Sequence, residues 1–411
     1  MAIDHPSEAG STAAEAPFIQ GGTPEFRRTN LALLAAGFST FALMYCVQPL
    51  MPVFSAEFGV SAAASALSLS LTTGLLAVAM LVASALSEAV GRKPVMVFSL
   101  LVSAALTVLS ALVPSWDQFL WLRALQGITF SGLPAVAMAY VSEEVDPKST
   151  GYAMGLYISG SALGGLGGRV ITGLLSDLGS WRLAIAAVGV IGLLAGLAFW
   201  RALPPSRHFQ PRPLAPRALL ANALDHLRDG GLRWLFLEGF LLMGALVTVY
   251  NYVAYRLLAP PFSLSQAIVG MIFAVYLVGI ASSTIAGTLA DRLGRPRIFW
   301  VAVLLMLFGL GLTLFESLVA VIGGLAVLTF GFFGAHSIAS SWVGRRARRA
   351  RAQASSLYLF CYYMGGSIVG VAGGVFWGSH GWHGVVALVG ALLLAALAVA
   401  AVLFRLKPLA P

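Results

Sequence analysis

Four ionisable residues lie inside long apolar stretches of this 411-residue chain: Arg123, Arg169, Glu238 and His336. Charged groups at such depth are costly, so each of them is a functional candidate by default. A carboxylic acid and an imidazole can exchange protons, and a guanidinium can bind an anion. These side chains therefore suggest proton movement or ion binding. We expect no metal site.

Glu238 is the only acid that we place inside a span, five residues beyond Arg233. Burial favours the protonated form of a carboxylic acid, which makes Glu238 the leading candidate for a proton carrier. The alternative is an interfacial glutamate paired with Arg233 or another arginine. His336, nine residues before Arg345, is the second candidate for proton exchange, or else a hydrogen-bonded packing residue.

The two arginines allow different interpretations. Arg123 shares a helical face with Gln126 at i+3, and it can hold a carboxylate deprotonated or bind an anionic substrate. Alternatively, Arg123 is a structural arginine that bonds backbone carbonyls. Arg169 lies in the outer half of its span, where its alternative is a side chain that extends to the outer membrane interface.

Aromatic and amide groups complete a candidate substrate pocket. A mostly apolar cavity with few polar groups suits amphipathic ligands. We rank Tyr45, Gln48 and Asn251 first, although tyrosines can equally be interface or packing residues. The full set of substrate-binding or cavity candidates is Tyr45, Gln48, Arg123, Gln126, Arg169, Tyr250, Asn251, His336, Tyr358 and Tyr362.

The composition requires that membrane spans position these groups. The chain is 59% hydrophobic and 10% charged, against roughly 25% charged residues in a soluble protein. A helix needs about 20 apolar residues to cross a bilayer, and the backbone must satisfy its own hydrogen bonds there. We therefore predict an all-α polytopic membrane protein whose twelve helices cover residues 30–54, 62–87, 94–114, 117–141, 150–175, 182–203, 232–257, 264–289, 298–315, 318–343, 353–378 and 384–404.

The basic residues predict the orientation. With the N-terminus inside, all but four of the 25 Lys and Arg residues fall in cytoplasmic segments. A Pro-rich polar segment at residues 204–231 separates six spans from the other six and is typical of a linker. The predicted domains are a disordered cytoplasmic tail (1–29), a six-helix bundle (30–203), a cytoplasmic linker (204–231), a second six-helix bundle (232–405) and a cytoplasmic tail (406–411).

The two halves repeat short sequence elements. "SALSEAVGRKP" at 84–94 returns, altered, as "GTLADRLGRPR" at 287–297, and "GSALGGLGG" at 160–168 returns as "GSIVGVAGG" at 366–374. Parallel repeats of this kind are an expected transporter architecture. Arg169 breaks the symmetry, because Val375 occupies its repeat position, and this asymmetry suggests a specific task. Glycines spaced by four indicate close helix packing at Gly160, Gly164, Gly168, Gly366, Gly370 and Gly374.

These motifs resemble the major facilitator superfamily over nearly the whole chain. The two repeated elements fit its loop 2–3 and loop 8–9 motifs, "RALQG" at 123–127 is similar to its helix-4 motif, and "GSALGGLGG" is similar to its helix-5 antiporter motif, with Gly165 replacing the usual proline. The chain resembles most the bacterial drug:proton antiporter group, in its YnfM-type, arabinose-efflux-like branch. "QPLMP" (48–52), "AMGLYISG" (153–160), "GGR" (167–169) and "VYNY" (249–252) carry that closer match.

The resemblance implies two pseudo-symmetric six-helix bundles with both termini in the cytoplasm. It implies that Arg123 belongs to the proton-coupling apparatus, and that the glycine-rich faces of helix 5 and its counterpart meet between the halves. The loop motifs can contact the opposite half when the cytoplasmic side closes, and so bias a two-state equilibrium. The alternative is a topology anchor with a tight turn. The gating candidates are Glu88, Gly91, Arg92, Gly287, Asp291, Arg292, Gly294 and Arg295.

We therefore predict a secondary transporter in the cell inner membrane, multi-pass and monomeric, that exports a small amphipathic compound, drug or sugar-like solute. Proton entry drives the export, without a cofactor. The alternative is a proton symporter that imports an organic anion or sugar. An enzyme is not predicted, because the chain contains no HExxH, G-x-S-x-G or Walker-type sequence. The net charge of +9 reflects topology and contact with lipid, and not nucleic-acid binding.

Overall fold

The computed structural model describes residues 17–211 and 216–405. The predicted tail at 406–411 and the first sixteen residues of the predicted N-terminal tail lie outside these ranges. The described ranges contain no β-strand, only an isolated bridge between Ile19 and Val145. Within them, nine helical stretches are long and apolar enough to cross a membrane.

The helices fall into two groups along the chain, which we call the first and second halves. The first half contains α1 (Pro24–Tyr45), the 3₁₀ turn η1 (Gln48–Leu50), α2 (Met51–Phe58), α3 (Ala62–Val90), α4 (Arg92–Ser110), α5 (Trp116–Phe130), α6 (Pro134–Glu144), α7 (Thr150–Leu178) and α8 (Trp181–Ala202). The second half, after the linker helix α9 (Pro216–Arg228), contains α10 (Leu232–Leu258), α11 (Gln266–Ile272), η2 (Phe273–Leu277), α12 (Val278–Leu293), α13 (Arg295–Leu312), α14 (Leu318–Arg346) and α15 (Arg351–Arg405).

Each of the twelve predicted spans has a helical counterpart. The first span is broken into α1, η1 and α2, the fourth into α5 and α6, and the eighth into α11, η2 and α12. α15 holds the last two spans, since His380 and Gly381 leave helical geometry in its interior. The all-α polytopic fold predicted from the sequence is confirmed.

Glycines at equivalent positions separate the second membrane span of each half from the third. Gly91 separates α3 from α4 with a φ of 109°, and Gly294 separates α12 from α13 with a φ of 92°. L-residues with side chains rarely adopt such values, so glycine is required there. The repeated loop motifs thus each contain a tight turn.

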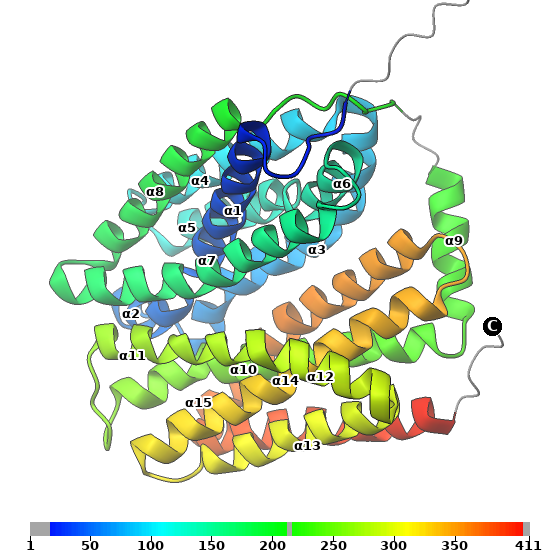
Figure 1. Cartoon of the computed structure of the whole chain (residues 1–411). Helices are drawn as coiled ribbons and strands as arrows, with labels where there is room; N and C mark the ends of the chain where they lie inside the picture. Colours follow the sequence, from blue (N-terminus) through cyan, green and yellow to red (C-terminus); the bar gives the residue numbers. More distant parts are fainter. Residues whose placement is uncertain (1–16, 212–215, 406–411) are drawn as a thin grey trace, which may run out of the picture.

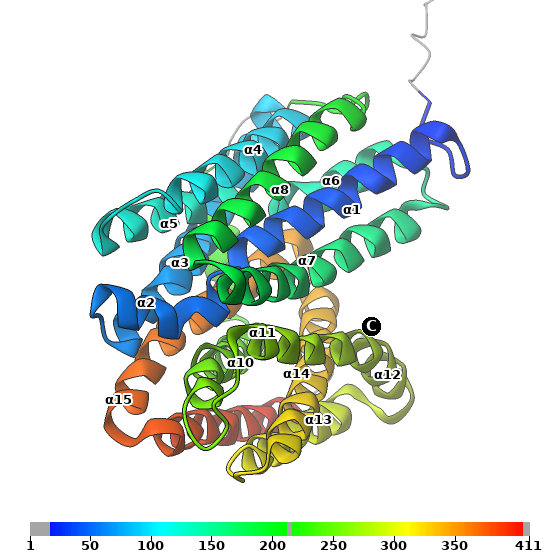
Figure 2. The same cartoon turned by 90° about the vertical axis from the view of Figure 1, so that its left-hand side faces the viewer.

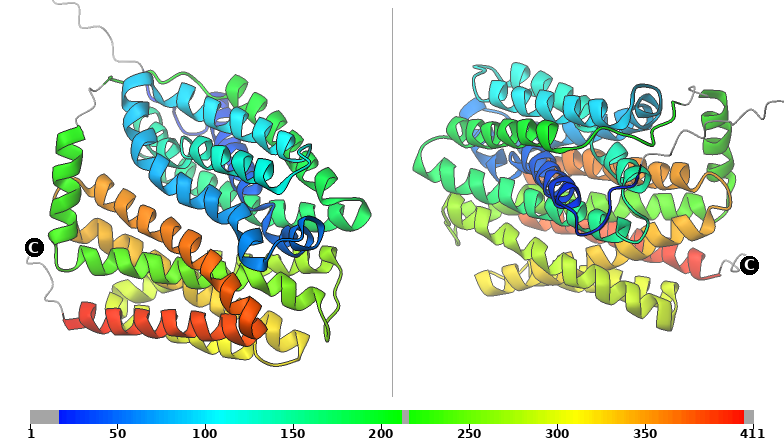
Figure 3. Two further views of the ribbon diagram at one scale, coloured as in Figure 1. Left: turned by 180° about the vertical axis from the view of Figure 1, so that it is seen from behind. Right: turned by 45° about the horizontal axis from the view of Figure 1, so that its top comes forward.

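The two halves form separate layers that meet on one side (Figure 1). α3 packs against α15 across the boundary, and α7 packs against α11. Figure 2 shows α11 beside α7, and Figure 3 shows the orange first part of α15 reaching the blue start of α3. We call the predicted cytoplasmic ends of the helices the inner side and the opposite ends the outer side. The halves meet toward the outer side.

Two predicted boundaries differ from the structure. α1 begins at Pro24 and not at residue 30, because Thr23 caps it by accepting a hydrogen bond from the N–H of Phe26 and Pro24 suits the first helical position. The predicted linker contains the helix α9. Its sequence carries an amphipathic pattern that the neighbouring prolines obscured.

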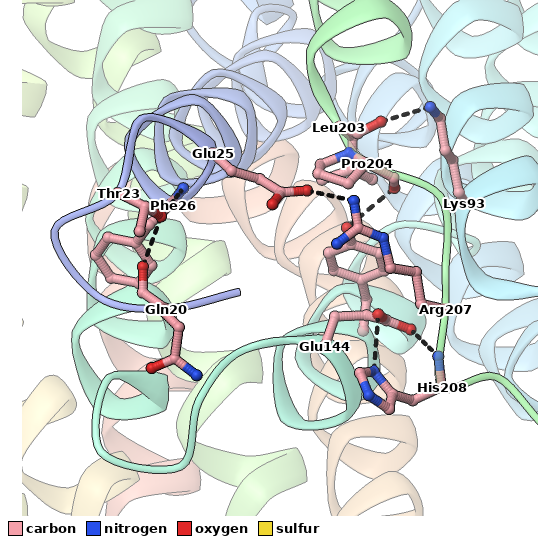
Figure 4. Close-up of polar contacts among 11 residues, drawn as sticks. Gln20, Thr23, Glu25, Phe26, Lys93, Glu144, Leu203, Pro204, Arg207 and His208 are labelled. Carbon is pink, nitrogen blue, oxygen red and sulfur yellow. Dashed lines mark hydrogen bonds and ion pairs between the residues drawn. The ribbon is translucent and has the colours of Figure 1, made fainter. Parts of the chain in front are cut away.

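The end of the predicted disordered tail is held against the inner side of the first half (Figure 4). The N–H of Ile19 donates to the carbonyl of Glu144 over 2.8 Å. The linker joins the same cluster, because Arg207 pairs with Glu25 at 2.7 Å and His208 pairs with the buried carboxylate of Glu144 at 3.2 Å. Residues 17–29 thus contact the inner ends of several helices of the first half.

Candidate functional site

The first span is broken by two prolines at its outer end. Pro49 and Pro52 lack the N–H groups that would continue the helix, so neighbouring carbonyls need other donors. Side chains supply them: Arg123 donates to Met44 O and Thr172 to Cys46 O, each over 2.9 Å. Gln266 of the second half donates to Pro49 O over 3.0 Å. The break is thus a point where both halves bind the same segment.

A chain of hydrogen bonds runs from this segment into the second half. Arg169 donates through its NH1 group to Gly165 O over 2.6 Å and through Nε to Gln48 Oε1 over 2.8 Å. Gln48 Nε2 then donates to Asn251 Oδ1 over 2.7 Å. Gln48, Arg169 and Asn251 are all buried, and Asn251 Nδ2 has no partner among the described residues. This series of hydrogen bonds therefore ends at an unpaired amide N–H group between the halves.

Three aromatic rings surround the guanidinium of Arg169. It lies 4.3 Å from the ring centre of Tyr45, 5.1 Å from that of Phe273 and 4.6 Å from that of Tyr276. Tyr45 belongs to the first half, and the other two rings belong to η2. Arg169 is 2% exposed, so the alternative of a side chain extending to the membrane interface is wrong. Its cation–π contacts join the two halves.

Arg123 lies inside the first half and contacts backbone. It donates to Ser68 O over 2.6 Å, to Met44 O and, more weakly, to Leu43 O, while its NH1 group reaches Gln126 Oε1 at 2.5 Å. It forms no ion pair with an acid among the described residues. These contacts agree with the alternative interpretation from the sequence, in which Arg123 is a structural arginine that bonds backbone carbonyls. Arg123 and Arg169 do not meet, but both hold the broken first span.

Glu238 is fully buried in α10, and neither carboxylate oxygen has a hydrogen-bond partner in the described part of the chain. It does not pair with Arg233, whose guanidinium lies over the Trp234 ring at 5.5 Å, so the alternative of an interfacial pair with Arg233 is wrong. The ring of Tyr358 lies against Gly239, the next residue. Tyr358 is also close enough to Glu238 for an electrostatic interaction, so this unpartnered acid lies near Tyr358.

His336 and two tyrosines form a cluster beside this acid. Tyr358 Oη and His336 Nδ1 are 2.9 Å apart, and the His336 ring lies 4.6 Å from that of Tyr362. Tyr250, by contrast, bonds Thr329 at 2.6 Å and packs on Tyr276. The predicted pocket residues thus fall into an interface group around Gln48 and a second-half group around His336.

The gating motifs bind within their own halves in this structure. Arg92 pairs with Glu143 at 2.7 Å, and Asp291 pairs with Arg295 at 2.8 Å and with Arg345 at 3.5 Å. Glu88 has no polar partner within residues 17–211 and 216–405. A Cβ added to Gly287 would meet no atom within 4 Å, and Arg292 is exposed. The contact between the halves that we expected from these loops is absent among the described residues.

Most of the predicted packing glycines pack within their own half, although we expected them to pack between the halves. Gly160, Gly164 and Gly168 pack against α1 in their own half, and Gly366 packs on α10. Only Gly370 and Gly374 of the six predicted glycines reach the other half, at Ser70 and Ala63. A glycine of α7 that does approach the second half is Gly173, one turn beyond Arg169.

The hydrogen bonds between the halves, as far as the described residues show, lie from mid-helix to the outer ends. They join Gln48 with Asn251, Ser367 with Ser70 O at 2.6 Å, Tyr255 with Ser55 at 2.7 Å and with Met51 O at 2.9 Å, and Gln266 and Ala267 with Pro49 O and Asp177. No hydrogen bond between described residues joins the halves at their inner ends. The structure therefore represents a form closed at the outer side.

The Major Facilitator Superfamily model matches residues 33–258 and 242–411. The chain belongs to the major facilitator superfamily. It is 51% identical to the inner membrane transport protein YnfM of Escherichia coli (strain K12) over 395 residues, which cover 94% of this chain and 93% of YnfM. It is also 51% identical to an uncharacterized MFS-type transporter, YybF, of Bacillus subtilis (strain 168), over 92% and 94% of the two chains. This superfamily protein is a membrane transporter and not an enzyme.

Solved superfamily transporters share the fold. A bacterial homologue of the human lysosomal transporter Spinster, in an inward-facing and unoccupied conformation, aligns with a TM-score of 0.76 at 17% identity, over 94% of this chain and 98% of that one. At such identity the likeness shows the fold alone. The resemblance inferred from the motifs, including the YnfM-type branch, is confirmed.

Sequence reasoning missed several residues that join the halves. Phe273, Tyr276, Gln266 and Asp177 all contact the opposite half. Aromatic residues in an apolar span carry no signal of their own, because every face of such a helix is hydrophobic. Asp177 follows Arg169 by eight residues, and this spacing was a signal that places both on one helical face.

Proposed function

We propose that the chain is a proton-coupled exporter of a small amphipathic solute, working by alternating access in the cell inner membrane as a monomer. The single observation that carries the proton coupling is Glu238, buried in α10 without a bonded partner for either oxygen among the described residues. A bare carboxylate at such a place costs several kcal/mol, and binding a proton removes that cost. Glu238 is therefore the proton carrier.

The His336–Tyr358 pair connects this acid with less buried groups. Tyr358 is buried and bonds His336, whereas His336 and Tyr362 are only partly buried. Imidazole and phenol can each donate and accept a proton, so they form a relay between Glu238 and solvent. Arg123, which the family resemblance places in proton coupling, supports the site indirectly by holding the broken first span.

The substrate binds where the chain of hydrogen bonds crosses between the halves. Asn251 Nδ2 offers an unpaired donor, and the rings of Tyr45, Phe273 and Tyr276 offer apolar faces nearby. A solute with an apolar body and a few acceptors fits this combination. Substrate that replaces Gln48 at Asn251 weakens the closed outer side, and this links binding to the conformational change.

The alternative of a proton symporter for an organic anion or sugar rests on Arg169. Its buried guanidinium has no acidic partner among the described residues, so an anionic solute would gain a charge-assisted bond there. Exporter and symporter predict opposite directions of proton movement on addition of substrate, and one experiment therefore separates them.

The experiment uses everted membrane vesicles that contain the full chain, acidified inside and monitored with a pH-quenched dye. Sugars, organic acids and amphipathic cations are added in turn. Proton export from the vesicle lumen, triggered by one compound and lost in Glu238→Gln, supports antiport. Acidification that increases with an anion supports the symporter. Proton flux in Glu238→Gln equal to that of the unchanged protein would contradict the proposed carrier.

A further inference from the structure

One face of α7 contacts the second half at three successive turns. Arg169, Gly173 and Asp177 are spaced by four residues, so they lie on one face of the helix. Arg169 reaches the rings of Phe273 and Tyr276, Gly173 meets Gly270, and Asp177 lies at the outermost turn. This face thus runs from the candidate substrate site to the outer end of the molecule.

Asp177 binds the start of α11 with both carboxylate oxygens. Its Oδ1 accepts a hydrogen bond from the N–H of Gln266 over 3.1 Å, and its Oδ2 accepts one from the N–H of Ala267 over 2.8 Å. The first N–H groups of a helix have no partner inside that helix. Ser265 accepts from the N–H of Ile268 in the same chain segment, at 3.3 Å, and Asp177 supplies the two other acceptors from the opposite half.

The packing beneath Asp177 brings the two helices close enough for these bonds. A Cβ added to Gly173 would lie 2.7 Å from Gln266 O, and one added to Gly270 would lie 3.0 Å from Arg169 O. No larger side chain fits at this crossing without displacing the backbone. The short side chain of Asp177 can therefore reach α11, which continues through η2 and α12 as the eighth span.

We propose that Asp177 is the latch of the outer side: its carboxylate caps α11 from the other half and stabilises the closed form. Opening outward separates α7 from α11, and the two N–H groups then lose their acceptor. The proposal rests on alternating access in the proposed function, but it concerns an equilibrium that exists without substrate. Loss of a capping carboxylate shifts that equilibrium toward the form open to the outside.

The test measures distances between spin labels in the full chain. Labels at Leu112 and Val319, which are 72% and 82% exposed at the outer ends of opposite halves, report opening to the outside. Labels at Tyr152 and Phe404, exposed at the inner ends, report closing inside. Cys46 and Cys361 are replaced by alanine in every variant, including the reference, so that only the introduced thiols react.

Asp177→Ala is expected to raise the ratio of outward-open to outward-closed protein about fivefold, which corresponds to about 1 kcal/mol. The outer distance lengthens and the inner distance shortens together. Asp177→Asn keeps an acceptor oxygen without the charge and is expected to give a smaller shift in the same direction. This variant also keeps the test valid if the alanine variant folds poorly.

Asp117→Ala is the matched control. Asp117 is an exposed acid in the first turn of α5, on the outer side of the same half. Its replacement by alanine removes the same charge as Asp177→Ala. Unchanged distances in both Asp177 variants, or an equal shift in Asp117→Ala, would overturn the proposal. A longer outer distance without a shorter inner one would overturn it too. A protein that transports nothing, yet shows the expected shift, supports the latch and refutes the proposed function.

Discussion

Gln48 Nε2 donates a 2.7 Å hydrogen bond to Asn251 Oδ1, and this bond joins the two halves at the proline break of the first span. Both amides are buried, and the second N–H of Asn251 remains without a described partner. A buried donor in this state costs about 1–3 kcal/mol, so a ligand acceptor gains that amount by binding it. The pair is therefore suited to exchange its mutual bond for bonds to a substrate.

Replacement of Asn251 by alanine is expected to raise the KM for the transported solute about tenfold, because one buried bond to substrate is lost. Gln48→Ala is expected to have a similar effect. Since the two amides form one unit, the double variant should be little worse than either single variant. Uptake of radiolabelled substrate into everted vesicles measures the KM in all three.

Thr248→Val is the control for the substitution in α10, one turn away. Thr248 is buried, its hydroxyl donates to Gly244 O of its own helix over 2.7 Å, and its methyl group lies beside Gly373 of the same half. The KM of the Thr248→Val variant for the transported solute should equal that of the unchanged protein. Fully additive effects of the Gln48 and Asn251 substitutions would show that the two amides act separately and would contradict a shared site.

The structural role of Arg123 leads to a second prediction. Arg123→Leu removes the donors to Ser68 O and Met44 O and the bond to Gln126. At about 1 kcal/mol or more per lost bond, the destabilisation should be on the order of 3 kcal/mol. Thermal unfolding of the detergent-solubilised protein should show a clearly lower midpoint, whereas Arg201→Ala, an exposed arginine of α8, should not. Full thermal stability with lost transport would instead favour direct proton coupling.

The sequence predicted the fold well for physical reasons. Twelve apolar runs determine the spans, because the bilayer allows few other arrangements. The distribution of Lys and Arg predicts their orientation. The glycine turns at Gly91 and Gly294 were also visible, since only glycine adopts their φ values readily. The helix α9 was missed because its amphipathic pattern lies in a Pro-rich stretch.

The site was predicted only in part. Polar residues such as Gln48, Arg169 and Asn251 stand out in apolar spans because burying them is costly. Their partners Phe273 and Tyr276 do not stand out, and the pairing depends on how α7 and α11 align across about a hundred residues of sequence. The contacts of Gly164 were likewise invisible, because a glycine in an apolar span does not reveal which helix it faces.

The bare carboxylate of Glu238 leads to a third prediction. Glu238→Gln cannot exchange a proton, so substrate-driven proton flux should fall to the level of vesicles without the protein. Exchange of labelled for unlabelled substrate should continue, because it needs no net proton movement. Glu316→Gln, an exposed acid on the outer side of the same half, should keep normal flux. Loss of both flux and exchange would indicate a role for Glu238 in folding or substrate binding.

The fourth prediction concerns Asp229, which lies outside the spans and caps α10. Its Oδ1 accepts from the N–H groups of Gly231 and Leu232, each over 2.8 Å, and from Arg346 Nε over 2.6 Å. Partial burial alone would raise the pKa of Asp229, but these hydrogen bonds outweigh it and hold the pKa below its ordinary value. A carboxylate with a lowered pKa contributes stability above the pKa of the unfolded chain, about 4, and loses it as the pH falls through the folded value.

Asp229→Ala should therefore destabilise the protein by about 1–2 kcal/mol at pH 7, because both the helix cap and the partner of Arg346 are lost. The midpoint of thermal unfolding should fall by about 1–2 °C. The difference from the unchanged protein should stay constant between pH 5 and pH 8. It should narrow below about pH 4, where the unfolded chain binds the proton first, and be lost below the lowered native pKa. Asp225→Ala, an exposed acid four residues earlier in α9, should show neither effect. A difference that grows on acidification would mean that Asp229 binds as the neutral acid, which contradicts the geometry.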